Sequence, residues 1–169
     1  MGQGRHKEEN ITRRQAEVMQ EICRFFSKLI LAGVDVPAPF GELAHSDGDV
    51  VYHALMDAIL GALALGDIGK HFPDNDDQYK NIDSSILVKK VYSLMKDNGC
   101  AINNIDISII LEKPKIKDYI MQMRENISNL LNTNIKNVSV KAGTNEGVGP
   151  LGRNEAVKAE AIVMLKEEE

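Results

Sequence analysis

The chain of 169 residues contains no tryptophan, and aromatic residues make up only 5% of it. A core must therefore be built mainly from aliphatic side chains, which a hydrophobic content of 43% can supply. The length is that of one domain. No apolar run reaches the roughly 18 residues of a membrane span, and the start, MGQGRHKEENITRRQ, lacks the apolar centre of a signal peptide. We therefore expect a cytoplasmic protein without a membrane partner.

Excess positive charge is also missing, because the formal net charge is −5. Proteins that bind nucleic acids in general need a basic face, so we expect no nucleic-acid partner. Cysteine is scarce as well: Cys23 and Cys100 lie far apart and form no CxxC motif. Two thiols in a reducing compartment are the expected state.

Hydrophobic periodicity predicts an α+β fold. Apolar residues recur at helical spacing in residues 11–27, 48–65, 84–99 and within 114–132. Alternating or β-branched runs predict strands at 29–37, 102–111, 137–142 and 156–165. Gly, Pro, Asp and Asn are dense in 66–83, which predicts a loop, and a glycine-rich connection covers 143–153. From residue 29 onward the order is β-α-α-β-α-β-β, which indicates a mixed β-sheet with helices packed on one face.

The start of the predicted helix 48–65 carries candidate ligands for a metal and a phosphate. Asp49, His53 and Asp57 are four residues apart, so they share one helix face. A metal-binding imidazole commonly donates its second N–H to a carboxylate, although this spacing taken alone is more often that of a solvated polar face. His45 and Ser46 precede the helix, where free N–H groups attract phosphate. The stretch therefore predicts a site for a phosphate ester with a metal.

Two further segments fit such a site. GDIGKHFPDND contains Asp67, Asp74 and Asp76, whose carboxylates suit polyol hydroxyls, or simply form a solvated acidic loop. KAGTNEGVG contains Thr144, Glu146 and flexible backbone N–H groups. Such a loop can bind phosphate and Mg²⁺, or only connect two strands.

Together, LILAGVDVP, AHSDGDVVYHALMDAILGALALGDIGKHFPDND, KPK, VSVKAGTNEGVG and GRNEA resemble the 2-C-methyl-D-erythritol 2,4-cyclodiphosphate synthase family. The resemblance runs from about residue 29 to the C-terminus. It implies a metal-dependent lyase of non-mevalonate isoprenoid biosynthesis that uses Zn²⁺ and Mg²⁺. The implied reaction cyclises a CDP-methylerythritol 2-phosphate and releases CMP. It also implies a homotrimer with active sites between subunits.

The resemblance assigns roles to individual residues. It implies that His53 binds zinc, that Glu146 binds Mg²⁺ and that His45 and Thr144 act on the transferring phosphate. Residues 67–76 would lie on the methylerythritol side, and Lys115 with residues 142–146 on the nucleotide side. The substrate-binding residues that it implies are His45, Ser46, Asp67, Ile68, Gly69, Phe72, Asp74, Asp76, Lys115, Ala142, Gly143, Thr144, Asn145, Glu146 and Arg153.

The chain departs from the family at its N-terminus, where the family places two zinc ligands in a strand of pattern G-x-G-x-D-x-H. In one alignment GQGRHKE supplies His6 and Glu8 instead, since a His/Glu/His set can bind zinc. In a second alignment EICRF supplies Glu21 and Cys23. A third possibility is an incomplete zinc site in a catalytically impaired trimeric binding or structural homologue. We therefore divide the chain into a divergent, helical segment 1–28 and a synthase-like domain 29–169.

Overall fold

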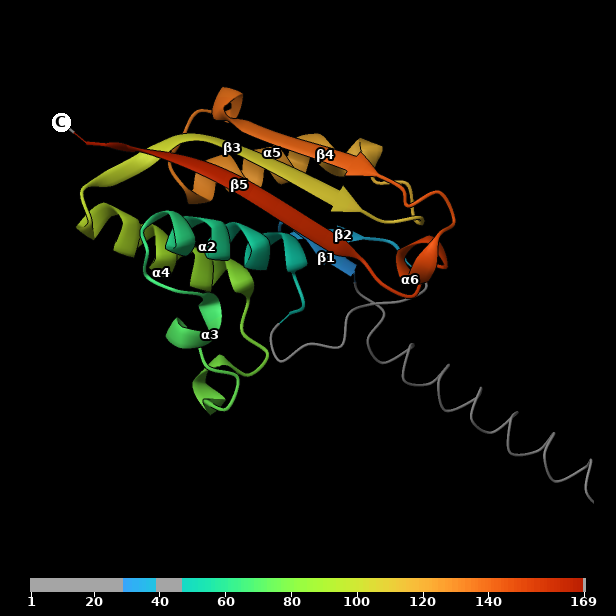
Figure 1. Cartoon of the computed structure of the whole chain (residues 1–169), viewed down its shortest axis with the longest axis horizontal. Coiled ribbons are helices and arrows are strands. Elements are labelled where there is room, and N and C mark those ends of the chain that lie inside the picture. The colour runs from blue at the N-terminus through green and yellow to red at the C-terminus, as the bar shows by residue number, and fades with distance from the viewer. Residues whose placement is uncertain (1–28, 39–46, 169) are drawn as a thin grey trace, which may run out of the picture.

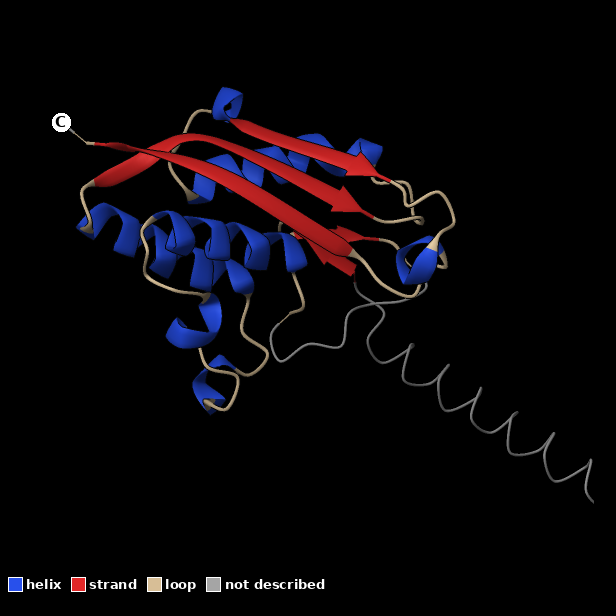
Figure 2. Cartoon of the chain, viewed as in Figure 1, coloured by secondary structure: helices blue, strands red, loops and turns tan. Residues whose placement is uncertain are grey.

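The structure is a computed structural model and describes residues 29–38 and 47–168. A three-stranded sheet with the order β4-β3-β5 forms one layer, and helices pack against one of its faces (Figures 1 and 2). β3 is parallel to β4 and antiparallel to β5, so the sheet is mixed. The strands span Cys100–Ile110 (β3), Val138–Gly143 (β4) and Lys158–Glu167 (β5). The predicted α+β architecture is confirmed.

The central strand β3 follows the alternation seen in its sequence. Ile105, Ile107 and Ile109 are buried against the helices, whereas Asp106 and Ser108 lie half-buried on the opposite face. This is the period of two that a strand with one covered face requires. The covered face of the sheet therefore builds the aliphatic core that the composition predicts.

The helices that cover the sheet are α2 (Val50–Ala62), α4 (Ser84–Asp97) and α5 (Ile120–Leu130). α4 ends where its sequence indicates: Gly99 has a φ of 70°, and its N–H donates to the carbonyl of Lys96 at 2.9 Å. Its N-cap is Asp83, because the Asp83 carboxylate accepts from the Ser85 N–H at 2.8 Å.

Residues 29–37 form a hairpin, so the prediction of one strand is wrong. β1 (Leu29–Leu31) pairs antiparallel with β2 (Val34–Val36). Ala32 and Gly33 form the turn, with φ values of 50° and 71°. Positive φ at both positions is what a two-residue hairpin turn needs. An alanine seldom marks such a turn, so the apolar run conceals it.

The segment 66–83, predicted as a loop, contains two short helices and projects from the helical layer (Figure 1). They are α3 (Ile68–His71) and the 3-10 helix η1 (Asp77–Tyr79). Each begins after an aspartate that caps it, Asp67 and Asp76 respectively. Both are too short to give the apolar periodicity from which helices are predicted.

The remaining elements are η2 (Lys117–Tyr119), η3 (Ile135–Asn137) and α6 (Gly149–Gly152). None of the helices in the described ranges is long and apolar enough to cross a membrane. Cys100 is a half-buried free thiol, as expected. The predicted helix 11–27 and Cys23 lie outside the described residues.

Candidate active site

A buried carboxylate fixes the start of α2. Asp49 is fully buried and accepts two N–H groups of the first helical turn at 3.0 and 3.1 Å. It also accepts the N–H groups of Ala32 at 2.9 Å and Gly33 at 2.7 Å in the hairpin turn. Burial raises the pKa of Asp49 to about 6, although these amide hydrogen bonds lower it. Asp49 is therefore a structural cap: backbone N–H groups occupy the carboxylate that the shared helix face had offered as a partner for His53.

His53 lies beside Ser84 and Asp47. The Ser84 hydroxyl is 3.3 Å from Nε2 of His53 and donates to the Asp47 carboxylate at 2.5 Å. Asp47 also accepts the Ser84 N–H at 2.9 Å. Burial lowers the pKa of His53, while Asp47 and Asp57 raise it. The net shift favours a neutral imidazole, which is the form that binds a metal ion.

His53 lines a pocket of about 420 Å³ between α2, the segment 66–83 and α4. Apolar side chains and a few polar groups form its wall, a combination typical of small-molecule sites. The lining residues are His53, Ile68, Gly69, Phe72, Pro73, Asp74, Asn75, Tyr79, Ile82 and Leu87. The structure thus brings His53 together with Ile68, Gly69, Phe72 and Asp74, which the resemblance places in the substrate site.

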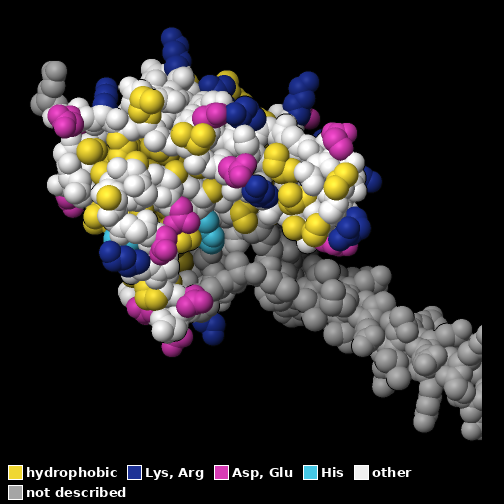
Figure 3. Space-filling view, viewed as in Figure 1, with side chains coloured by type: hydrophobic (Ala, Val, Ile, Leu, Met, Phe, Trp, Pro, Cys, Tyr) yellow, Lys and Arg dark blue, Asp and Glu magenta, His cyan; other side chains and the backbone are white. Residues whose placement is uncertain are grey.

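Three aspartates hold the projecting segment in shape. Asp57 of α2 accepts the N–H of Ile68 at 2.8 Å, which ties α3 to α2. Asp67 caps α3 by accepting from the Lys70 N–H at 2.9 Å, and Asp76 caps η1. Asp67 and Asp76 are not among the described residues that line the pocket. Figure 3 shows acidic side chains clustered on this segment.

The loop after β4 contains the second group of predicted residues. The Thr144 hydroxyl donates to the Glu146 carboxylate. Glu112, which follows β3, accepts the backbone N–H groups of Asn145 at 2.8 Å and Gly147 at 3.2 Å. Glu112 therefore ties this loop to the KPK segment. Glu112 was not predicted as a site residue, although its place directly before KPK was a usable signal.

α6 packs against the same loop through a glycine contact. A Cβ on Gly152 would lie 2.1 Å from the carbonyl carbon of Gly147, so no larger residue fits there. Asn154 follows with a φ of 65° and accepts the Lys113 N–H at 3.1 Å. Asparagine tolerates this left-handed conformation better than most residues do. The contacts of Gly152 and Asn154 thus help to shape the loop.

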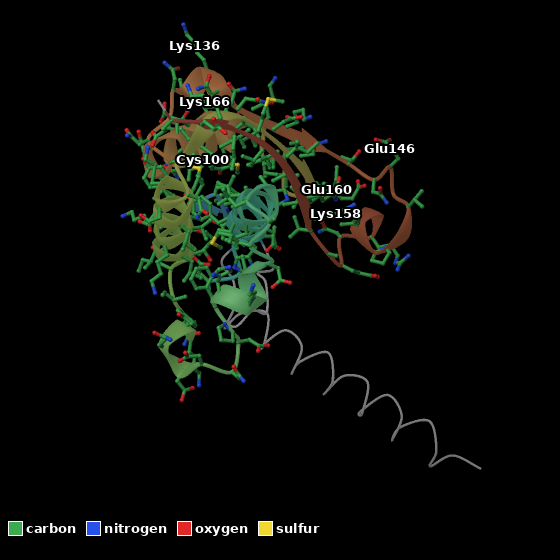
Figure 4. All side chains as sticks on the ribbon, turned by 60° about the vertical axis from the view of Figure 1, so that its left-hand side comes forward. Cys100, Lys136, Glu146, Lys158, Glu160 and Lys166 are labelled. Carbon is green, nitrogen blue, oxygen red and sulfur yellow. The ribbon has the colours of Figure 1, made fainter. Side chains whose placement is uncertain are left out.

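Those predicted site residues that the structure describes fall into two groups that lie apart in the chain. Glu146 lies at the end of β4 near α6, well away from α3 (Figures 1 and 4). Ala142 and Gly143 end β4 in the same region. Arg153 is exposed and pairs with Glu155 at 2.8 and 2.9 Å, and Lys115 is also exposed.

Six candidate residues lie outside the described part of the chain: His6, Glu8, Glu21, Cys23, His45 and Ser46. Within residues 29–38 and 47–168, no group of three His, Cys, Asp or Glu side chains could hold a metal ion. Of the predicted zinc ligands, the structure therefore describes His53 alone.

The protein is thus of the α+β class, with a mixed sheet covered by helices on one face. A pocket lined by His53 lies beside these helices. A model of the YgbB family matches residues 18–166, and the chain belongs to this family. A protein named 2-C-methyl-D-erythritol 2,4-cyclodiphosphate synthase from Brachyspira hyodysenteriae is 54% identical over 139 residues, 82% of this chain and 88% of that protein. A protein of the same name from Carboxydothermus hydrogenoformans is 52% identical over 140 residues, 83% of this chain and 86% of that protein. The family resemblance is confirmed.

Solved structures agree with this assignment. The IspF–CDP complex from Plasmodium falciparum superposes with a TM-score of 0.75 at 35% identity, covering 85% of this chain and 86% of that chain. The bifunctional IspDF from Campylobacter jejuni gives a TM-score of 0.80 at 43% identity over 83% of this chain. The match covers only 38% of the bifunctional chain, so it concerns one part of that protein.

Proposed function

We propose that this chain is a cyclising, CMP-releasing phosphorus–oxygen lyase. Its substrate is 4-diphosphocytidyl-2-C-methyl-D-erythritol 2-phosphate and its product 2-C-methyl-D-erythritol 2,4-cyclodiphosphate, in non-mevalonate isoprenoid biosynthesis. The pocket carries the proposal, because His53 lies there with Ile68, Gly69, Phe72 and Asp74. Relatives named 2-C-methyl-D-erythritol 2,4-cyclodiphosphate synthase, at 52–54% identity, support the same substrate. The related IspF structure with CDP supports it as well.

The reaction needs no nucleophile from the protein. An oxygen of the 2-phosphate attacks the β-phosphorus, the bond from the β-phosphorus to the oxygen bridging to the α-phosphate breaks, and CMP leaves with that oxygen. Holding both phosphates of one substrate in reach supplies much of the acceleration. We assign the Thr144 hydroxyl to the transferring phosphate and His45 to the charge that develops on it.

The pocket would bind the methylerythritol part. Ile68 and Phe72 offer apolar contacts to its carbon skeleton. The Asp67 carboxylate uses Oδ1 to cap α3, and its Oδ2 can accept a hydrogen bond from a substrate hydroxyl. We assign Lys115 and the loop 142–146 to the nucleotide diphosphate.

A homotrimer would bring the two groups of site residues together, the pocket from one subunit and the loop from its neighbour. The separation of Glu146 from α3 within one chain supports this proposal (Figure 4). Ile162 and Met164 are 72% and 59% exposed on β5, an edge strand of the sheet. Such apolar exposure favours contact with another copy.

We propose that His53 holds zinc with two ligands from residues 1–28. Its half-buried, neutral imidazole suits this role. The family match begins at residue 18, so it includes Glu21 and Cys23 but not His6 and Glu8. That boundary supports the Glu21/Cys23 set.

We assign Mg²⁺ to the Glu146 carboxylate, which is exposed in the loop after β4. When bound, the two metal ions would neutralise phosphate charge and polarise the β-phosphate. The Thr144 hydroxyl, which already contacts Glu146, would then lie beside the same phosphate.

Turnover in H₂¹⁸O tests the cyclisation directly. We expect CMP and the cyclic diphosphate in equal amounts, with no ¹⁸O in either product by mass spectrometry. A hydrolase would instead place ¹⁸O in a linear bisphosphate or in CMP. Either that labelling, or no CMP from folded protein under any metal condition, would refute the proposal.

A further inference from the structure

The ammonium of Lys90 on α4 lies over two aromatic rings of the projecting segment. Its Nζ is 5.9 Å from the ring centroid of Phe72 and 5.1 Å from that of Tyr79. Both distances are within the range of about 6 Å for cation–π attraction. The two rings pack edge to face, with centroids 5.5 Å apart. We call Lys90, Phe72 and Tyr79 the aromatic clamp.

The clamp connects α4 to a segment that packs on the core only through half-buried side chains. No residue of α3 or η1 is fully buried, and helices of this length are unstable in isolation. The first end of the segment is tied by the hydrogen bond between Ile68 and Asp57. The second end is tied by the bond from the Asp47 N–H to the Ile82 carbonyl at 3.2 Å. The clamp lies between these two ties.

The clamp also shapes the pocket without placing Lys90 in it. Phe72 and Tyr79 line the pocket, whereas Lys90 is not among its described lining residues. Lys90 is exposed and forms no ion pair within the described ranges. In this part of the chain, its ammonium contacts the rings of Phe72 and Tyr79. Its contact with the pocket wall is therefore through the two rings.

We propose that Lys90 is a positioning residue: it holds Phe72 and Tyr79, and through them the segment 66–83, in the geometry that forms the pocket wall. The substrate part of this inference rests on the proposed function. Without the ammonium, the two rings lose a shared partner and the segment samples more open positions. Substrate binding then has to restore the wall, which raises KM more than it lowers kcat.

Four proteins separate charge from packing. Lys90→Met removes the ammonium and keeps an unbranched chain of similar length. Lys90→Arg keeps a cation that stacks on aromatic rings. Lys89→Met is the matched control, because Lys89 is the exposed neighbour on the same helix and forms no ring contact in the described structure. The wild-type chain is the reference.

Amide hydrogen exchange of the full chain without substrate tests the clamp independently of catalysis. We expect peptides covering residues 68–80 to exchange about two- to fivefold faster in Lys90→Met than in wild type. Lys90→Arg and Lys89→Met should exchange like wild type. Equal exchange in Lys90→Met and wild type would overturn the proposal.

Steady-state CMP release then tests the functional consequence. We expect KM in Lys90→Met to rise about two- to fivefold with kcat nearly unchanged, and Lys90→Arg to restore it. A raised KM without faster exchange would overturn the clamp, since the charge would then act directly on the anionic substrate. Faster exchange in Lys90→Met, with no CMP released by wild type, would support the clamp and refute the proposed substrate.

Discussion

Replacing Asp49 by alanine should lower the free energy of unfolding by about 4 kcal/mol. The carboxylate is fully buried and accepts four backbone N–H groups, two from α2 and two from the turn at Ala32 and Gly33. A buried donor left unpaired costs about 1–3 kcal/mol, and the lower end of that range gives about 4 for the four donors. This exceeds the about 0.5–2 kcal/mol of a lost N-cap alone, because Asp49 also holds the hairpin.

Urea unfolding followed by circular dichroism, at pH 7 and at equal protein concentrations, measures this loss. A thermal melt should show a fall of about 8–16 °C. Asp49→Asn keeps the three bonds at Oδ1 and loses the bond from Gly33, so it should lose only about 1–3 kcal/mol. Asp97→Ala, at an exposed carboxylate on α4, should change stability by less than about 0.5 kcal/mol. A loss below about 1 kcal/mol in Asp49→Ala would show that these four hydrogen bonds do not stabilise the fold as stated.

Three further predictions concern the same structure. Burial raises the pKa of Asp49 from 3.8 to about 6, so its contribution to stability is largest below pH 3.8 and falls as the pH rises through 6. Relative to wild type, Asp49→Asn should therefore gain on the order of 3 kcal/mol between pH 4 and pH 7, measured by urea unfolding; a constant difference would contradict the shifted pKa. Gly152→Ala should displace Gly147 and reduce kcat/KM for CMP release at least about tenfold. Gly61→Ala is the control, because a Cβ there would have no atom within 4 Å, and it should leave kcat/KM unchanged. Equal kcat/KM values in the two variants would show that the loop tolerates the clash. Glu112→Leu should leave two N–H groups of the 144–147 loop without their acceptor and raise KM by about two- to tenfold. The KM of Glu112→Gln should lie between those of Glu112→Leu and wild type. An unchanged KM in Glu112→Leu would show that Glu112 does not position this loop for binding.

Elements that local patterns determine were predictable from the sequence. The alternation of Ile105, Ile107 and Ile109 located β3, and Gly99 located the end of α4. The hairpin at Ala32 was not predictable in this way. Its positive φ is held by Asp49, a carboxylate 17 residues away, and no local pattern contains that contact.

The candidate site was predictable as a set of residues but not as a geometry. The motif located His53, Ile68, Gly69 and Phe72, which share one pocket. Asp49 lies on the predicted helix face, yet backbone donors from the hairpin turn occupy its carboxylate. The loop at Glu146 lies apart from α3 within one chain (Figures 1 and 4), which is why the proposed function includes a neighbouring subunit.

The most direct test of the proposed function is the rate of CMP release from 4-diphosphocytidyl-2-C-methyl-D-erythritol 2-phosphate, with Mg²⁺ present and zinc added or chelated. We predict turnover that zinc supports in wild type and that falls at least about a thousandfold in His53→Ala. His71→Ala serves as a matched control: the His71 imidazole contacts the Leu65 carbonyl and is not a predicted zinc ligand, so this variant should retain its zinc. Wild-type turnover in His53→Ala, or no turnover by the folded wild-type protein under any metal condition, would contradict the account.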